Sequence, residues 1–152
     1  MEELIKTTFD WSRMLPQAVK MALAFLIALP IAFNRERKTR IMGLRTFPLV
    51  AIVSCSYILI AVSIVGSEAQ AQARIVQGLI TGIGFVGGGA ILKNDDGVVG
   101  TATAASIWAT GAVGAAVAFG YIDIALILAV LTFIVLRIFT PLKQAIDEGE
   151  GV

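Results

Sequence analysis

Two neighbouring carboxylates, Asp95 and Asp96, are the residues whose types point most directly to chemistry. They follow Lys93 and Asn94 and precede Gly97, so carboxylate, amide and backbone oxygens are concentrated in one short segment. Oxygen ligands of this kind suit a hard divalent cation such as Mg2+. The same residues are also typical of a turn, because Asn and Asp bond their own backbone and Gly adopts positive φ. The pattern therefore predicts either a magnesium site at Asp95 and Asp96 or a turn, and it requires no other cofactor.

Most other reactive groups are missing from the sequence. There is no histidine, and the single cysteine, Cys55, lies inside an apolar run. Imidazole bases, Cys/His zinc sites and internal disulfides are therefore excluded. The segment Gly82 to Gly87 matches the GxGxxG pattern of dinucleotide-binding loops, but it lies in an apolar stretch and the carboxylate expected about 20 residues on is replaced by Ile107. We expect neither nucleotide binding nor enzymatic activity.

Composition identifies the elements that must position these residues. Of the 152 residues 57% are hydrophobic and 15% are charged, whereas soluble domains are roughly 45–50% apolar and about 25% charged. A span of the bilayer takes roughly 20 apolar residues. Five stretches qualify: 15–33, 47–65, 75–92, 102–119 and 122–139. The fold class predicted is an all-α, polytopic membrane bundle of about five transmembrane helices, with the lipid bilayer as its first partner.

The basic residues of the short loops predict the orientation of this bundle. Segment 34–46 carries five cations and one carboxylate, and assigning it to the cytoplasm also places Lys93, Arg137 and Lys143 inside. We therefore expect a protein of the cytoplasmic (inner) cell membrane with its N-terminus outside and its C-terminus inside. Residues 1–14 are expected to lie in the outer interface, 15–140 to form the transmembrane domain, and 141–152 to form a short cytoplasmic tail. With a net charge of +1, the chain offers no general attraction for nucleic acid.

Small residues predict how the helices pack. Gly78 to Gly82 and Gly84 to Gly88 are GxxxG spacings, which allow helix backbones to approach closely in lipid. At about 100° per residue, two stripes of small and polar residues form, Gln77–Thr81–Gly84–Gly88 and Thr103–Ser106–Thr110–Gly114. We expect these stripes to face each other at the centre of the bundle. As an alternative, the three glycines 87–89 unwind their helix and present carbonyl oxygens to a cavity.

The basic segment 34–46 contains one carboxylate, Glu36, with four cations within four positions of it. Glu36 is therefore a poor metal ligand, and we expect it to fasten the loop through an ion pair, with Arg45 as the candidate partner. The remaining cations are expected to meet anionic lipid headgroups or an acidic partner.

Four motifs together resemble the MgtC/SapB family of bacterial and archaeal membrane proteins. They begin with Asn34-Arg35-Glu36-Arg37 and Gly43-Leu44-Arg45-Thr46, and continue with 82–92 and 100–108. The residues that carry the match are Arg35, Glu36, Arg37, Gly43, Arg45, Thr46, Gly82, Gly84, Gly87, Gly89, Thr103, Ser106 and Trp108. Asn34, Met42 and the segment 99–103 depart from the usual residues of the family. The resemblance covers the family's hydrophobic domain and not the cytoplasmic C-terminal domain of its longer members.

The resemblance implies a role in magnesium homeostasis and in adaptation to low Mg2+, exerted by modulating other membrane transport or energetics machinery. A small transporter or channel that itself conducts Mg2+ or another cation is the alternative. The absence of an acidic residue deep inside a predicted span speaks against that alternative, and the glycine-rich segments with polar stripes speak for it. Expected partners are a second copy of the chain, with a dimer favoured, and other membrane proteins.

Overall fold

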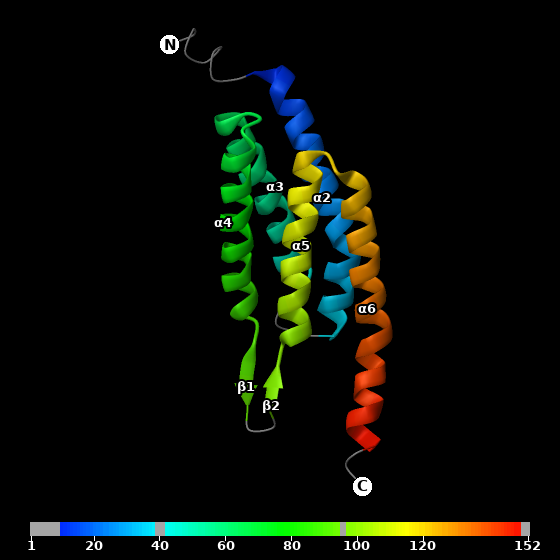
Figure 1. Cartoon of the computed structure of the whole chain (residues 1–152). Helices are drawn as coiled ribbons and strands as arrows, with labels where there is room; N and C mark the ends of the chain where they lie inside the picture. Colours follow the sequence, from blue (N-terminus) through cyan, green and yellow to red (C-terminus); the bar gives the residue numbers. More distant parts are fainter. Residues whose placement is uncertain (1–9, 39–41, 95–96, 150–152) are drawn as a thin grey trace.

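The computed structural model describes residues 10–38, 42–94 and 97–149, and within them it contains five helices and one small hairpin (Figure 1). The helices are α2 (Trp11–Lys38), α3 (Thr46–Val65), α4 (Ala69–Gly88), α5 (Thr101–Phe119) and α6 (Ile122–Gly149). The strands are β1 (Leu92–Asn94) and β2 (Gly97–Val99), and they pair antiparallel. The predicted all-α membrane bundle is confirmed.

The helices lie side by side and alternate in direction, so that the N-terminus and the C-terminus lie at opposite ends of the bundle (Figure 1). Helices α2, α3, α5 and α6 are each long and apolar enough to cross a membrane. Helix α4, which has 20 residues like α3, is less apolar, because three glutamines and Arg74 occupy its first half. The end of α2, the start of α3, the strands β1 and β2 and the C-terminal part of α6 all lie at one end (Figure 1).

The bounds of the third predicted span were wrong. Helix α4 begins at Ala69 and ends at Gly88, whereas the sequence predicted 75–92. Its first turns are polar and carry no apolar signal in the sequence. Gln72 Nε2 donates to the Gly66 carbonyl oxygen at 2.6 Å and so fixes the turn after α3. At the other end, the N–H groups of Ala90 and Ile91 bond the carbonyls of Gly87 and Gly88 in tight turns. The glycines therefore end the helix and do not interrupt it within the span.

Helix α2 is longer than its predicted span of 15–33 at both ends, because residues 11–14 form its first turn and residues 34–38 continue it. The carboxylate of Asp10 accepts hydrogen bonds from the N–H and hydroxyl of Ser12, at 3.0 and 2.6 Å. An oxygen at this position satisfies N–H groups that the helix itself leaves open. The hydrogen bond from the Ser12 hydroxyl also lowers the pKa of Asp10. Further along, Lys20 Nζ donates to the carbonyl of Ala118 at 2.7 Å and joins α2 to α5.

Helix α5 is the centre of the bundle and packs against all four other described helices. Its buried residues are small or β-branched: Thr103, Ser106, Ile107, Thr110, Gly111, Val113, Gly114, Val117 and Ala118. A Cβ on Gly111 would overlap the side chain of Ile83 in α4, and a Cβ on Gly114 would overlap the carbonyl oxygen of Ala51 in α3. Close approach at these two glycines is what lets α3 and α4 pack on α5.

The outer faces of the bundle are strongly apolar. In α6, large hydrophobic side chains such as Ile127, Leu131 and Ile138 are exposed, and the buried hydrophobics among its described side chains are Ala125, Ala129 and Leu136. A water-soluble protein rarely exposes so much contiguous apolar surface. These faces are suited to contact with lipid.

The two small-residue stripes do not face each other, contrary to prediction. Thr103, Ser106 and Thr110 are buried, whereas Gly84 and Gly88 on α4 are exposed and a Cβ on either would meet nothing within 4 Å. Gly82 is equally open. The residues of α4 that are buried are Ile83 and Gly87. Helix α4 therefore presents its apolar Ile83 face to α5, because this side chain fills the space above Gly111.

We predict opposite effects for the same substitution at two glycines. Gly114→Ala forces the backbone of α3 away from α5 and should cost about 1–3 kcal/mol of stability. Gly78→Ala, in α4, meets open space and replaces glycine with a better helix former, so it should be neutral or stabilising by up to about 1 kcal/mol. Unfolding midpoints of the purified variants in one detergent measure the difference. Equal midpoints would contradict the close contact at Gly114.

Candidate functional site

The motif residues of α2 lie in its last turns, at the end of the bundle that carries Arg35, Arg37, Arg45, Lys93 and Arg137. We call this the basic end. Because consecutive residues of a helix point about 100° apart, the motif divides between two environments. Asn34 and Arg35 are buried, whereas Glu36 and Arg37 are exposed.

Glu36 connects α2 to the segment that leads into α3. Its Oε2 accepts a hydrogen bond from the backbone N–H of Leu44 at 2.9 Å. A Cβ on Gly43 would overlap this carboxylate and would lie 2.7 Å from the Cα of Glu36. The two motifs thus form one tight contact that requires glycine at position 43. Thr46, half-buried, is the first residue of α3.

The expected ion pair between Glu36 and Arg45 was wrong. Among the side chains that the structure describes, the recorded ion pair is Arg13 with Asp10, at 3.3 Å. Glu36 does fasten the loop, but through a backbone amide, and Arg45 is exposed. An exposed ion pair contributes little and loses side-chain entropy, whereas the Leu44 N–H precedes a helix and needs an acceptor.

Arg35 is a charged side chain in the interior, with 3% of its surface exposed. Its Nη1 donates to the Thr103 hydroxyl at 3.5 Å, which links the end of α2 to the first turn of α5. The Ser106 and Thr110 hydroxyls donate to the carbonyls of Ala102 and Ser106 in their own helix. In the predicted polar stripe of α5, Thr103 therefore bonds a residue of α2, whereas the hydroxyls of Ser106 and Thr110 bond carbonyl groups of α5 itself. Trp108 is exposed on the opposite face.

The glycines between α4 and α5 permit a second close approach at the basic end. Gly100 has a φ of +91°, in the left-handed region that favours glycine. A Cβ there would also overlap the carbonyl oxygen of Ala90. A Cβ on Gly87 would lie 3.2 Å from the carbonyl oxygen of Ala104, so Gly87 is a close-packing glycine. Gly89 only caps α4.

The predicted metal ligands Asp95 and Asp96 lie outside the described residues. The strands on either side of them pair with Asn94 opposite Gly97, and Gly97 has a φ of +125°. Within the described part of the chain, no three acidic, histidine or cysteine residues gather where they could hold a metal. The magnesium site at Asp95 and Asp96 stays a prediction.

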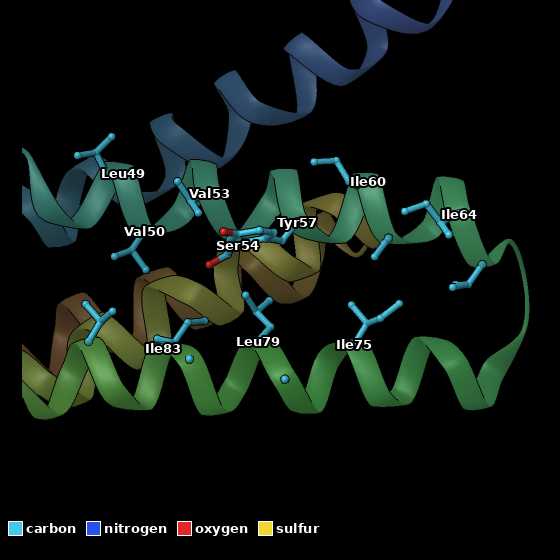
Figure 2. A pocket seen from close by; sticks show the side chains of 15 residues that line it. Leu49, Val50, Val53, Ser54, Tyr57, Ile60, Ile64, Ile75, Leu79 and Ile83 are labelled. Atoms are coloured by element: carbon cyan, nitrogen blue, oxygen red, sulfur yellow. The ribbon is translucent and has the colours of Figure 1, made fainter.

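Two hollows lie on the described surface. The larger, of about 770 Å3, runs between α3 and α4, and its lining side chains are apolar apart from Ser54 and Tyr57 (Figure 2). Ile75, Leu79 and Ile83 of α4 point toward α3 across it. The smaller, of about 440 Å3, lies between α2 and α6 at the basic end. Asn34, Arg37 and Arg137 supply its polar lining.

The sequence did not predict that Arg37 and Arg137 line the same hollow, because they are 100 positions apart and on different helices. Their shared place could have been anticipated only from the charge count at one end of the bundle. Contact between the first motif and Thr103 was equally invisible, because a single hydroxyl carries no spacing signal.

Comparison with known proteins agrees with the motifs assembled at this end. The model of the MgtC family matches residues 21–145. This range includes all of α3, α4 and α5 and most of α2 and α6. The chain belongs to the MgtC family. It is 34% identical to Protein SrpB of Synechococcus elongatus over 89% of this chain and 79% of the relative.

Other members of the MgtC family are longer than the region they share with this chain. Protein MgtC of Brucella abortus is 32% identical over 90% of this chain and 57% of its own length. The putative magnesium transporter YhiD of Escherichia coli is 29% identical over 82% of this chain and 60% of its own length. This chain therefore spans less than two thirds of these two relatives. No solved structure matches it.

The contact between Glu36 and Leu44 can be tested with a matched pair of substitutions. Glu36→Ala removes the acceptor and should cost about 0.5–1.5 kcal/mol, the net value of one hydrogen bond. Glu36→Gln keeps a side-chain oxygen of the same reach and should retain most of the stability. Thermal unfolding of the purified proteins in lipid nanodiscs compares them. If the alanine variant is as stable as the glutamine variant, the hydrogen bond does not hold this loop.

Proposed function

We propose that this chain is a multi-pass protein of the cell membrane that supports magnesium homeostasis and adaptation to low Mg2+ by acting on other membrane machinery. It neither carries the ion itself nor catalyses a reaction. Membership of the MgtC family supports the link to magnesium, and one relative is named a putative magnesium transporter. Because the two relatives named MgtC and YhiD extend well beyond the region shared with this chain, their whole activities are not transferred to it.

The observation that carries this proposal is the sign of the interior charge. Arg35 is a buried cation, and every carboxylate among the described side chains, namely Asp10, Glu36, Glu68 and Asp123, is exposed. A divalent cation crossing the bundle would lose hydration, and no carboxylate among the described side chains lies in the interior to replace it. Cation pathways through membranes usually carry buried acidic residues that offset that loss. A modulating role requires no such pathway.

Direct transport is the second candidate, and the large groove between α3 and α4 is the feature that favours it. Its volume of about 770 Å3 would accommodate a solute, and it extends along most of α3 (Figure 2). Its lining, however, offers the side-chain oxygens of Ser54 and Tyr57 and otherwise apolar groups. Mg2+ keeps most of its water and prefers several oxygen ligands, so this groove suits hydrocarbon better than Mg2+.

Flux measurements distinguish the two candidates. The purified protein is reconstituted into vesicles that enclose a magnesium-sensitive dye, and a Mg2+ gradient is applied. We expect uptake equal to that of protein-free vesicles, while an ionophore added at the end shows that the dye responds. A protein-dependent uptake that saturates with Mg2+ would establish direct transport and overturn the modulating role.

We further propose that the basic end faces the cytoplasm and that the N-terminus lies outside. Arg35 and Arg37 lie in the last turn of α2, Arg45 precedes α3, Lys93 lies in β1, and Arg137 lines a hollow together with Arg37. Cytoplasmic segments are the ones enriched in Lys and Arg. We also propose self-association as a dimer. It is supported by α4, which packs on α3 and α5 and leaves Gly84 and Gly88 exposed.

Cysteine labelling tests this orientation and the crossing of α4 together. After Cys55→Ala, single cysteines replace Ser67, between α3 and α4, and Asn94, in β1. A membrane-impermeant thiol reagent should label Ser67→Cys on intact cells and Asn94→Cys only after permeabilisation. Both residues are exposed in the structure, so accessibility does not limit the reaction. Labelling of both variants from the same side would show that α4 does not cross the membrane.

A further inference from the structure

The smaller hollow at the basic end has a chemical character that the proposed function does not use. Among the residues that the structure describes, six line it, from α2 and α6: Pro30, Phe33, Asn34, Arg37, Phe133 and Arg137. Its volume of about 440 Å3 is in the range of ligand sites. Helices α2 and α6 pack against each other directly, so both walls belong to one rigid pair of helices.

The described side chains that line the hollow carry two positive charges and no negative one. Arg37 and Arg137 are both exposed, and neither forms an ion pair with any carboxylate among the described side chains. Two guanidinium groups that face one hollow repel each other. An anion between them would remove that repulsion, and the planar guanidinium fork fits the oxygens of a phosphate with two parallel hydrogen bonds.

Asn34 adds an independent sign of a missing ligand. Its side chain is 9% exposed and lines the hollow, and its Oδ1 has no hydrogen-bond partner in the described part of the chain. Buried polar side-chain atoms are normally hydrogen-bonded, so each exception needs an explanation. The Oδ1 atom is enclosed, so the group that Asn34 can offer to a phosphate or hydroxyl oxygen in the hollow is its NH2, which donates.

The order of residues along both helices gives the hollow a direction. On α2, Pro30 and Phe33 precede Arg37, and on α6, Phe133 precedes Arg137 by one helical turn. One turn is about 5.4 Å along the helix. The aromatic rings therefore lie nearer the middle of the bundle than the cations do. A free inorganic anion would make no use of that apolar half, whereas an amphipathic anion would fill both halves.

We propose that this hollow binds the headgroup of an anionic phospholipid. Its phosphate lies between Arg37 and Arg137, the Asn34 amide bonds a headgroup or ester oxygen, and the start of the acyl chains lies against Phe33 and Phe133. The lipid belongs to the leaflet at the basic end. Basic pockets between transmembrane helices are suited to such headgroups.

The proposal is tested on the full chain in micelles of a zwitterionic detergent, with phosphatidylglycerol and phosphatidylcholine of the same acyl chains as probes. Binding is read by native mass spectrometry and by the rise in unfolding temperature. We expect phosphatidylglycerol to bind and stabilise the protein more than phosphatidylcholine does. Arg37→Gln and Arg137→Gln should each weaken its binding about fivefold, and the double variant about 25-fold, from the contribution of one cation at an anionic surface.

The matched control is Arg45→Gln, which removes an exposed cation from the same end but outside the hollow. It should change binding by less than about twofold, because the charge lies away from the site and screening weakens distant charges. An equal loss in Arg45→Gln would mean diffuse attraction to the surface and would overturn the site. Either single variant binding phosphatidylglycerol as the parent does would also overturn it, and this reading does not depend on the double variant folding.

A last arm separates lipid from free anion. Inorganic phosphate is added to the protein in the same micelles without phosphatidylglycerol. We expect no stabilisation at millimolar concentration. Stabilisation by inorganic phosphate that equals that of phosphatidylglycerol, and that Arg37→Gln abolishes, would overturn the lipid assignment.

Discussion

Close approach of α5 to its neighbours is the constraint on which the rest of this bundle depends. In lipid there is little hydrophobic gain from bringing two apolar helices together, so packing and backbone proximity must stabilise the contact. Gly114 sits against the backbone of Ala51 in α3, and Gly111 sits against Ile83 in α4. Both glycines lie on the central helix, which packs against all four others. A side chain at position 114 would force the backbone of α3 away from α5, and one at position 111 would force the Ile83 side chain to move.

The contacts at the basic end follow from that packing. Once α5 is close to α2 and α3, the hydroxyl of Thr103 comes within reach of Arg35, and a cation can remain in an apolar interior. The adjacent Glu36 turns outward and bonds the Leu44 N–H, which is possible because Gly43 has no side chain. Buried charge, exposed carboxylate and glycine thus form one interdependent unit. The contacts of Glu36 with Leu44 and Gly43 are local, but the position of these residues relative to α5 depends on the glycines of the central helix.

The cations of the basic end lie at two depths in the bundle. Arg35 is enclosed by the bundle, whereas Arg37 and Arg137 line a hollow that opens outward. Cations at the surface favour contact with anionic headgroups. The same family motif therefore contributes to the packing of the bundle through one residue and to its surface charge through residues one or two positions away.

Sequence by itself determined the class of fold, the number of helices, their approximate limits and the family. Those properties depend on local hydrophobicity and on motifs of consecutive residues, which are visible along the chain. The sequence did not locate the end of α4, because the glycines 87–89 are as compatible with the middle of an apolar span as with its end. Only the tertiary structure decided that Ile83, and not Gly84, faces α5, that Glu36 bonds a backbone amide, and that Arg37 shares a hollow with Arg137. These outcomes depend on the rotation of each helix about its axis and on pairs of residues far apart in the chain. Rotation is set by which side chains fit against a neighbouring backbone, and no periodicity within one helix specifies its neighbour.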